Sequence, residues 1–375
     1  MNSTLAILLV DDDKDVLDLL QDGLDKTLDG FDLYWHPCNS FREAETLLNA
    51  VRFDLVATDI YEDRGEKAVE QNHKARNLLD VVREKRFCPV VVFSDASKPD
   101  DPIYDDPFVR FVDKAAGDAA LVGAIRELLK TNVPTVARQL HEDLDSMGAQ
   151  YLWTFLSKHW DSIREEFGEH EALDRLVRRR AAVQLGRLDQ ESGTERETVH
   201  PSEYYLYPPV ASSHRFGEII KHKENANVYR FILTPHCHLV VQPNHGRPRA
   251  DHVLTALATP LDSNAVKRLG TPNNHPDAQP DREKIRRALS IRSEFGSPRG
   301  RYCILPPFLD LPPLQCDWMQ LESVAIDELN DQFSVVAVLD SPFAESAQAA
   351  FNAFYANVGI PNLDLERVLK TLNIE

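Results

Sequence analysis

The sequence predicts an α/β domain with a doubly wound, five-stranded parallel sheet, followed by a helical hairpin and a mainly β (α+β) C-terminal domain. Strands and helices alternate over about the first 130 residues, two amphipathic helices follow, and short apolar runs punctuated by Pro and Gly fill the rest. At 375 residues the chain is too long for one ordinary domain. We expect a domain over 1–132, a connector over 133–190 and a second domain over 195–375.

The elements of the first domain are indicated by apolar runs and by helix start signals. Helices are expected to begin near Lys14 and at Ser40, where Ser40 and Glu43 have the spacing of a capping box. The expected strands cover about 5–10, 31–36, 53–58, 89–94 and 108–113, with further helices over 77–85 and 119–129. A doubly wound parallel sheet places its functional site at the carboxyl edge.

Four of these strands end in polar residues. The first ends at Asp11 and Asp12, the third at Asp59, the fourth at Ser94 and the fifth at Lys114. Acids that converge from two strand ends are costly unless positive charge lies among them, and Mg²⁺ prefers such oxygen ligands. The sequence therefore predicts a magnesium site at this edge of the sheet.

Acids, hydroxyl and lysine at strand ends in this order resemble the receiver domain of two-component response regulators, over about residues 4–132. The resemblance implies that Asp59 is the nucleophile that takes a phosphoryl group from the phosphohistidine of a sensor histidine kinase. It implies that Ser94 and Lys114 contact the phosphoryl group and that Ser94 and Phe111 relay the switch. Phosphorylation and dephosphorylation of the receiver itself are the only catalysis that we expect.

The same resemblance implies Mg²⁺ as the cofactor. Its ligands would be Asp11, Asp12, Asp59 and the backbone carbonyl of Tyr61. The chain also departs from the family pattern, because Ala115 follows Lys114 where the family has a proline, usually with a cis bond. This loop is therefore expected to be either trans or strained. The segment 62–78 lacks the usual proline-glycine turn, which affects the surfaces for kinase docking.

Charge and composition restrict the partners. The formal net charge is −18, with 60 acidic against 42 basic residues, so binding to nucleic acid is not expected. No apolar run is long enough to span a membrane and no leader is visible, so we expect a cytoplasmic protein without membrane contact. The five cysteines are scattered and imply no disulfide framework.

The connector is expected to be a helical hairpin. After Asn132-Val-Pro134, a long amphipathic stretch runs from Thr135 to Phe167, and a second helix ends near Leu188. Its apolar stripes pack either within the chain or against a second copy. A homodimer through the helices of 135–188 is one of these two alternatives.

The C-terminal half is expected to be an irregular antiparallel barrel or sandwich. The apolar runs that predict its strands are Phe216–Lys221, Val228–Thr234, Leu239–Gln242, His252–Thr259, Tyr302–Leu305, Trp318–Ile326 and Phe333–Leu339. Short helices are expected over 263–269, 281–291, 343–355 and 363–372, with Ser341 as N-cap and Pro342 as the first residue of the third.

One cluster in this half has candidate chemistry. His236 and His238 would alternate on one face of an extended segment, with Cys237 on the other face. Such histidines bind a metal only if other ligands complete the shell; the candidates are His214, His222, His245, Cys303 and Cys316. The alternative hypothesis is therefore a receiver-controlled effector enzyme with its site around His236, Cys237 and His238.

A further resemblance concerns the C-terminal half as a whole. The Thr-Pro-x-Cys strand end, the strand from Arg301 to Pro306 and the segment from Leu339 to Pro361 resemble a module of bacterial phage-defence proteins. A receiver joined to such a module resembles the non-effector response regulator of Detocs-type anti-phage two-component systems. That resemblance implies a protein without DNA-binding output that acts as a phosphate sink for the kinase in antiviral defence.

Overall fold

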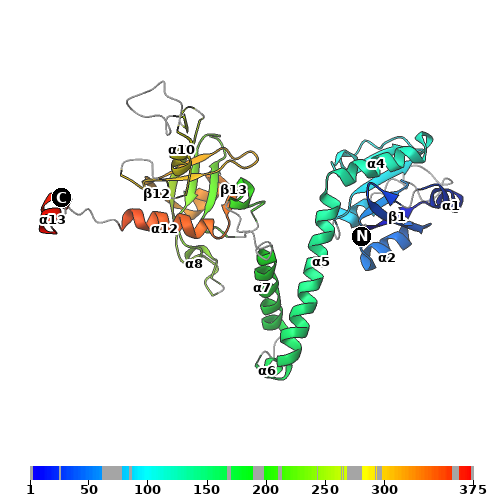
Figure 1. Ribbon diagram of the computed structural model, residues 1–375, viewed down its shortest axis with the longest axis horizontal. Helices are drawn as coiled ribbons and strands as arrows, with labels where there is room; N and C mark the ends of the chain where they lie inside the picture. Colours follow the sequence, from blue (N-terminus) through cyan, green and yellow to red (C-terminus); the bar gives the residue numbers. More distant parts are fainter. Residues whose placement is uncertain are drawn as a thin grey trace. The chain divides into compact units, whose positions relative to one another are not determined.

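The computed structural model forms two compact units, residues 1–194 and 195–375. Each is described by itself (Figure 1). No helix in the described part of the chain combines the length and the apolar character needed to cross a membrane. The residues that the structure describes are 3–24, 27–60, 78–83, 87–166, 170–188, 198–209, 213–242, 244–262, 264, 266–267, 281–291, 293, 298–356 and 363–372.

The first unit contains a parallel sheet with the strand order β3-β1-β4-β5-β6. In chain order this is 2-1-3-4-5, the order of flavodoxin-like folds, to which receiver domains belong. The short strand β2 pairs antiparallel with β3 at one edge. The five-stranded parallel sheet predicted from the sequence is thus present with one added edge strand. The strands are β1 Ser3–Val10, β2 Thr27–Leu28, β3 Phe31–Cys38, β4 Leu55–Thr58, β5 Val90–Ser94 and β6 Val109–Asp113.

Helices cover both faces of this sheet. Helices α1 (Lys14–Gly23) and α4 (Asp118–Lys130) share one core with alternate β1 residues, including Leu5, Ile7 and Leu9. Helix α2 (Phe41–Ala50) and the helical residues 78–83 share the other core with Leu8 and Val10. A parallel strand that is apolar on both sides is buried between two layers of helices, which explains the uninterrupted apolar run of β1.

The helix start signals are also confirmed. Asp13 caps α1, since its side chain accepts a hydrogen bond from the Asp15 amide, and Ser40 caps α2 by accepting from the Glu43 amide. The helix expected over 77–85 is described only over 78–83. Two 3-10 turns complete the domain, η1 (Pro102–Asp105) and η2 (Lys114–Ala116).

The connector is helical, as predicted, but its first helix changes type along its length. Helix α5 (Val133–Tyr151) passes into a π-helical segment, η3 (Leu152–Leu156), then a 3-10 turn, η4 (Ser157–His159), and α6 (Trp160–Glu166). Helix α7 (His170–Leu188) follows, and α5 and α7 contact each other as a hairpin (Figure 1). Val133 and Pro134 are the first residues of α5, where proline costs no hydrogen bond.

The second unit is built on one antiparallel sheet with the strand order β11-β12-β10-β9-β8-β13-β7. In the described residues it is an open sheet with two edges, so the predicted barrel or sandwich is wrong. Helices rather than a second sheet bury its faces. The strands are β7 Tyr205–Leu206, β8 Glu218–His222, β9 Tyr229–Ile232, β10 His252–Pro260, β11 Tyr302–Leu305, β12 Leu314–Ala325 and β13 Phe333–Leu339.

Helix α12 (Phe343–Tyr355) covers one face of this sheet, over the fully buried Trp318. The Phe351 ring lies edge-on to Trp318 at 5.5 Å, and the Tyr355 hydroxyl donates to the Trp318 carbonyl. On the other face, Leu239 of α8 (His236–Leu239) and Leu329 of α11 (Ile326–Gln332) share a core with strand residues. The domain is therefore mainly β with helices on both faces, which agrees with the predicted α+β class.

Several predicted boundaries differ from the structure. The expected strand Leu239–Gln242 is wrong, because the chain turns through α8 and the Val240 amide donates to the His236 carbonyl. Pro342 is the N-cap of α12, which begins at Phe343 rather than at the proline. The helix expected over 263–269 lies largely outside the described residues. Three further elements are η5 (Pro201–Tyr204), α10 (Arg282–Ala288) and α13 (Leu365–Thr371).

Candidate functional site

The carboxyl edge of the parallel sheet gathers the polar residues that end its strands. Asp11 follows β1, Asp59 follows β4, Ser94 ends β5 and Lys114 follows β6. A backbone hydrogen bond aligns two of these strand ends: the Asp59 amide donates to the Val10 carbonyl, which extends the pairing of β1 and β4 by one residue. Parallel strands end at the same edge, so residues far apart in sequence meet here.

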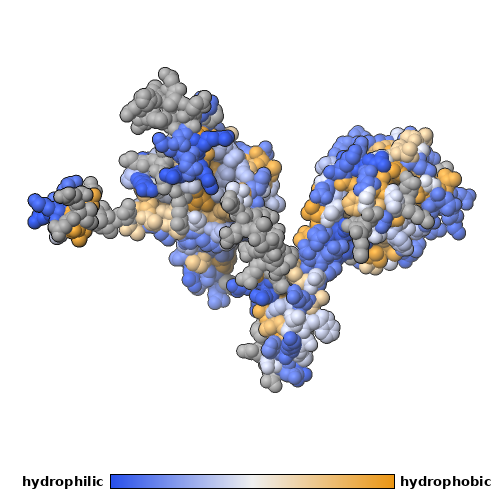
Figure 2. All heavy atoms as spheres, in the orientation of Figure 1, coloured by the Kyte–Doolittle hydropathy of each residue, from blue (hydrophilic) through white to orange (hydrophobic). Residues whose placement is uncertain are grey.

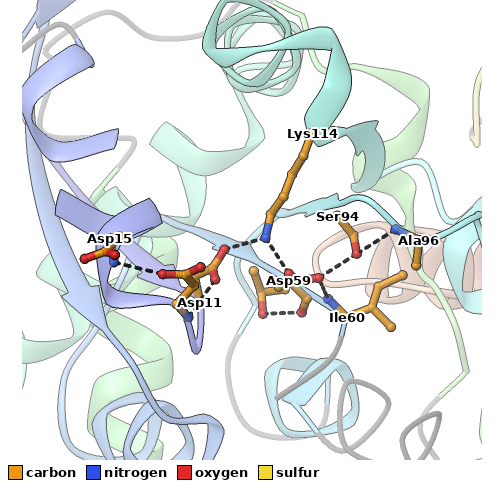
Figure 3. Close-up of polar contacts among 9 residues, drawn as sticks. Asp11, Asp15, Asp59, Ile60, Ser94, Ala96 and Lys114 are labelled. Carbon is orange, nitrogen blue, oxygen red and sulfur yellow. Dashed lines mark hydrogen bonds and ion pairs between the residues drawn. The ribbon is translucent and has the colours of Figure 1, made fainter. Parts of the chain in front are cut away.

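Asp59 is the centre of this cluster (Figure 3). Lys114 Nζ donates to Asp59 Oδ2 at 2.5 Å and to Asp11 Oδ2 at 2.6 Å, so one ammonium bridges the two carboxylates. On the other side, the Ser94 hydroxyl and the Ile60 amide both donate to Asp59 Oδ1, each at 2.5 Å. Both oxygens of Asp59 are thereby held in place by donors from three different parts of the chain.

The cluster is buried, which strengthens its electrostatics. Asp11 is 2% exposed and Asp59 is 7% exposed. Burial raises the pKa of Asp11 above its usual value, although Lys114 acts in the opposite direction. Burial alone would lower the pKa of Lys114, but its hydrogen bonds to Asp11 and Asp59 outweigh this effect and the pKa is raised. Lys114 is therefore a fixed positive charge between two buried acids.

Three acids at this edge are placed to hold a cation. Asp11, Asp12 and Asp59 each offer a carboxylate oxygen, and these oxygens lie within 4.8 Å of one another. The donor set is all oxygen, which suits the hard Mg²⁺ ion, and the single ammonium of Lys114 does not balance the two buried carboxylates of Asp11 and Asp59. These residues therefore fit a divalent cation. The fourth ligand expected from the sequence, the Tyr61 carbonyl, lies outside the described residues.

The loop after Lys114 accommodates the alanine that replaces the family's proline. The described cis peptide bonds precede Pro208 and Pro342, so the bond between Lys114 and Ala115 is trans. The Ala115 amide donates to the Asp113 side chain at 2.8 Å, an interaction that a proline could not make. Gly117 ends the turn at φ 77°, a conformation that favours glycine.

The residue expected to change rotamer, Phe111, lies three positions before Lys114 on β6. It is half-buried and packs against the core that contains α2 and residues 78–83. The hydroxyl of Ser94, its expected partner in switching, is fully engaged: it donates to Asp59 and accepts from the Ala96 amide at 3.3 Å. Both residues lie on neighbouring strands of the sheet, Ser94 beside the acid cluster.

The candidate site in the second unit is not assembled among the described residues. His236, Cys237 and His238 are exposed on the short helix α8, so the expected alternation of an extended segment is wrong. Of the candidate ligands, Cys303 and Cys316 are fully buried in the core, away from this surface. The one candidate metal cluster of the described residues is the aspartate cluster of the first unit.

Two pairings of buried acids with half-buried bases in the second unit were not predicted. His214 Nδ1 lies 2.6 Å from Glu218 Oε2, and its Nε2 lies 2.9 Å from Asn330 Oδ1. Arg301 makes two hydrogen bonds to Asp317, at 2.8 and 2.6 Å. The available signal was an acid inside one expected strand, Glu218, and an acid directly before another, Asp317, because a buried carboxylate requires a partner.

No protein-family model matches the chain, and no curated protein matches it. Solved structures to which it is similar include the receiver domain of the Francisella response regulator 1452, with 18% identity and a TM-score of 0.27 over 34% of this chain and 98% of that chain. The response regulator TrrA from Thermotoga maritima, in complex with Mg²⁺-BeF, has 19% identity and a TM-score of 0.27; the match covers 33% of this chain and 98% of that chain. A response regulator receiver protein from Sinorhizobium medicae has 22% identity and a TM-score of 0.26; the match covers 35% of this chain and 97% of that chain.

Proposed function

We propose that the chain is a response regulator that accepts a phosphoryl group on Asp59 from a sensor histidine kinase. The observation that supports this most directly is the placement of the Asp59 carboxylate between the Lys114 ammonium and the Ser94 hydroxyl, at the carboxyl edge of the sheet. A carboxylate held among an ammonium, a hydroxyl and a backbone amide is suited to nucleophilic attack on phosphorus.

In the proposed reaction, an oxygen of Asp59 attacks the phosphorus of phosphohistidine. A P–O bond forms, the P–N bond breaks, and the histidine of the kinase is released. Lys114 is placed to transfer its hydrogen bond from Asp59 Oδ2 to a phosphoryl oxygen, and Ser94 is placed to donate to another. Asp11, Asp12 and Asp59 would hold Mg²⁺, with the Tyr61 carbonyl as a further ligand; the ion would neutralise charge on the phosphoryl oxygens.

We further propose that the phosphorylated chain stores and hydrolyses phosphoryl groups rather than driving a DNA-binding output. The support is the resemblance of the C-terminal half to a module of phage-defence regulators, together with the acidic net charge of −18. A sink of this kind would compete with a separate regulator for the same kinase. Its setting would be bacterial antiviral defence in the cytoplasm.

Phosphorylation of Asp59 can be tested with a small phosphodonor. The purified chain is incubated with acetyl phosphate and Mg²⁺, and intact mass spectrometry measures the addition of one phosphoryl group. The Asp59→Asn protein should show none. Asp54→Asn is the matched control, because Asp54 is half-buried and precedes the same strand, β4; the asparagine can still accept from the Ala6 amide. Phosphate that persists in Asp59→Asn would refute the assignment.

The storage role requires a separate measurement. Phosphoryl transfer from the kinase to a second regulator should slow when this chain is added and should return to its original rate when Asp59→Asn replaces it. If the added wild-type chain leaves the transfer rate unchanged, the proposed sink is contradicted. The separate proposal that Asp59 is phosphorylated would not be affected by this result.

A further inference from the structure

The two arms of the connector hairpin enclose a groove with a volume of about 530 Å³. Its walls come from α5, η3 and α7, and the lining residues of each arm are spaced four apart, so they share one face of their helix. Small-molecule sites have volumes of about 300–1,000 Å³, so the groove is large enough for a small organic ligand. It is lined by Gln150, Tyr151, Thr154, Phe155, Leu176 and Arg180.

One wall of the groove includes the π-helical segment η3. Its hydrogen bonds span five residues, since the Ser157 amide donates to the Leu152 carbonyl. Thr154 and Phe155 of this segment line the groove, and the Thr154 hydroxyl donates to the Gln150 carbonyl at 2.6 Å. Single π-helical turns within α-helices are rare and frequently lie at functional sites. The departure from α-helical geometry in the connector therefore coincides with the wall of a groove.

The same wall is aromatic. The rings of Tyr151 and Phe155 stack with their centroids 5.1 Å apart and their planes 21° apart. Phe155 is 38% exposed, although it is a large apolar side chain, and Leu176 of the other arm is half-buried. Aromatic rings bind other rings in offset stacked or edge-to-face arrangements. A planar ring is therefore the ligand body that this wall suits best.

Arg180 gives the groove a positive charge. Of the described residues that line the groove, none is acidic. The one acid among the described side chains of α7, Asp174, pairs with Arg178 at 2.9 Å. A guanidinium binds a carboxylate through two parallel hydrogen bonds, so one arginine suits a ligand with a single negative charge. The hairpin surface has this mixed character: in Figure 2, pale and orange residues lie among the blue ones.

We propose that this groove binds a small aromatic carboxylate. Its carboxylate group binds the Arg180 guanidinium, and its ring packs against Tyr151 and Phe155. Because the walls come from both arms, the bound ligand joins η3 to α7 and stabilises the hairpin. The groove contains no residue of the acid cluster around Asp59, so this inference does not depend on phosphorylation of the chain.

The test is calorimetric titration of the full chain, without a phosphodonor, with three compounds. Naphthoate carries both the ring and the carboxylate, naphthalenemethanol carries the ring without the charge, and octanoate carries the carboxylate without the ring. Naphthoate should bind at least about tenfold more tightly than either of the other two, because each lacks one of the two interactions. Absence of naphthoate binding at millimolar concentration would overturn the proposal, and so would equal affinity for naphthoate and either of the other compounds.

A charge-removing variant locates the carboxylate. Arg180→Gln should lower the affinity for naphthoate about tenfold and leave the affinity for naphthalenemethanol unchanged. Arg179→Gln is the matched control, because Arg179 is an exposed neighbour that lies outside the residues lining the groove; it should leave both affinities unchanged. An unchanged affinity for naphthoate in Arg180→Gln, or an equal loss in Arg179→Gln, would overturn the proposal.

A second variant locates the ring. Phe155→Leu should lower the affinities for naphthoate and for naphthalenemethanol about fivefold each, because a stacking partner is lost. Trp153→Leu is the matched control, since Trp153 belongs to the same π-helical segment but is 75% exposed and lies outside the lining residues. Hydrogen exchange gives an independent measurement: naphthoate should slow exchange of the α7 amides in the wild-type chain and not in Arg180→Gln. Equal protection of α7 in both proteins would overturn the proposal.

Discussion

Replacing Lys114 with methionine removes the ammonium that contacts Asp11 and Asp59 while keeping most of the side-chain volume. The Ser94 and Ile60 hydrogen bonds to Asp59 remain, so the cluster keeps its donors on one side and loses its charge compensation on the other. The side chains of Lys114, Asp11 and Asp59 are 12%, 3% and 8% exposed, which places the interaction among buried ion pairs.

The expected loss follows from this burial. Removing one partner of a buried ion pair costs about 3–5 kcal/mol, because the remaining charge is left uncompensated in a medium of low dielectric constant. Two carboxylates remain here, so we expect Lys114→Met to lower the free energy of unfolding of the receiver by about 3 kcal/mol or more without Mg²⁺. Mg²⁺ at a hundred times its dissociation constant should restore about 2.7 kcal/mol.

The assay is hydrogen exchange of the slowest amides of β1 and β4, which reports the free energy of opening of the sheet. Lys98→Met is the matched control, since Lys98 pairs with Asp105 at 2.5 Å but both side chains are exposed, at 42% and 74%. A surface pair of this kind contributes about 0–1 kcal/mol. A loss below about 1 kcal/mol in Lys114→Met, or an equally large loss in Lys98→Met, would refute the reasoning.

Three further outcomes are expected. Asp12→Ala should weaken Mg²⁺ binding at least about tenfold, measured by calorimetric titration. The control Asp13→Ala should cost about 1 kcal/mol of stability, because α1 loses its N-cap, and should leave the affinity for Mg²⁺ unchanged. The hydrogen bond to Glu218 raises the pKa of His214 above 6.5. The stability that protonated His214 contributes should therefore be complete below pH 6.5 and should decline as the pH rises through the folded-state pKa of His214. Melting temperatures measured against pH should show this decline in the wild-type chain and lose it in His214→Asn. Trp318→Ala should destabilise the second unit by about 3–5 kcal/mol in urea titrations, with phosphorylation of Asp59 retained as the sign that the receiver is intact.

The fold of the first unit could be predicted from sequence because its information is local and repeated. Each parallel strand is a continuous apolar run, and each run ends in a polar residue such as Asp59 or Lys114. Since all parallel strands of the sheet end at one edge, the topology brings these residues together without knowledge of any side-chain contact. The trans bond before Ala115 is the default for a non-proline residue, whereas the hydrogen bond of its amide to Asp113 is a contact that the sequence analysis did not predict.

The second unit could not be predicted to the same depth. Residues 236–239 are too few to distinguish the period of a strand from that of a helix, and the apolar Leu239 is compatible with both. The helical turn depends on Leu239, which is 2% exposed, packing against the core on that face of the sheet. The choice between an open sheet and a barrel likewise depends on α12 covering the Trp318 face, a long-range contact.

The balance of buried charge distinguishes the two units. In the part of the second unit that the structure describes, each buried acid has one base: Glu218 pairs with His214, and Asp317 pairs with Arg301. Balanced pairs satisfy one another and require no further ligand, as expected of groups that stabilise a core. In the first unit, the two buried acids Asp11 and Asp59 share the single ammonium of Lys114, so the buried acids exceed the base. Such an excess is costly unless a cation binds, and it therefore favours this edge of the sheet, rather than the second unit, for the proposed metal and phosphoryl site.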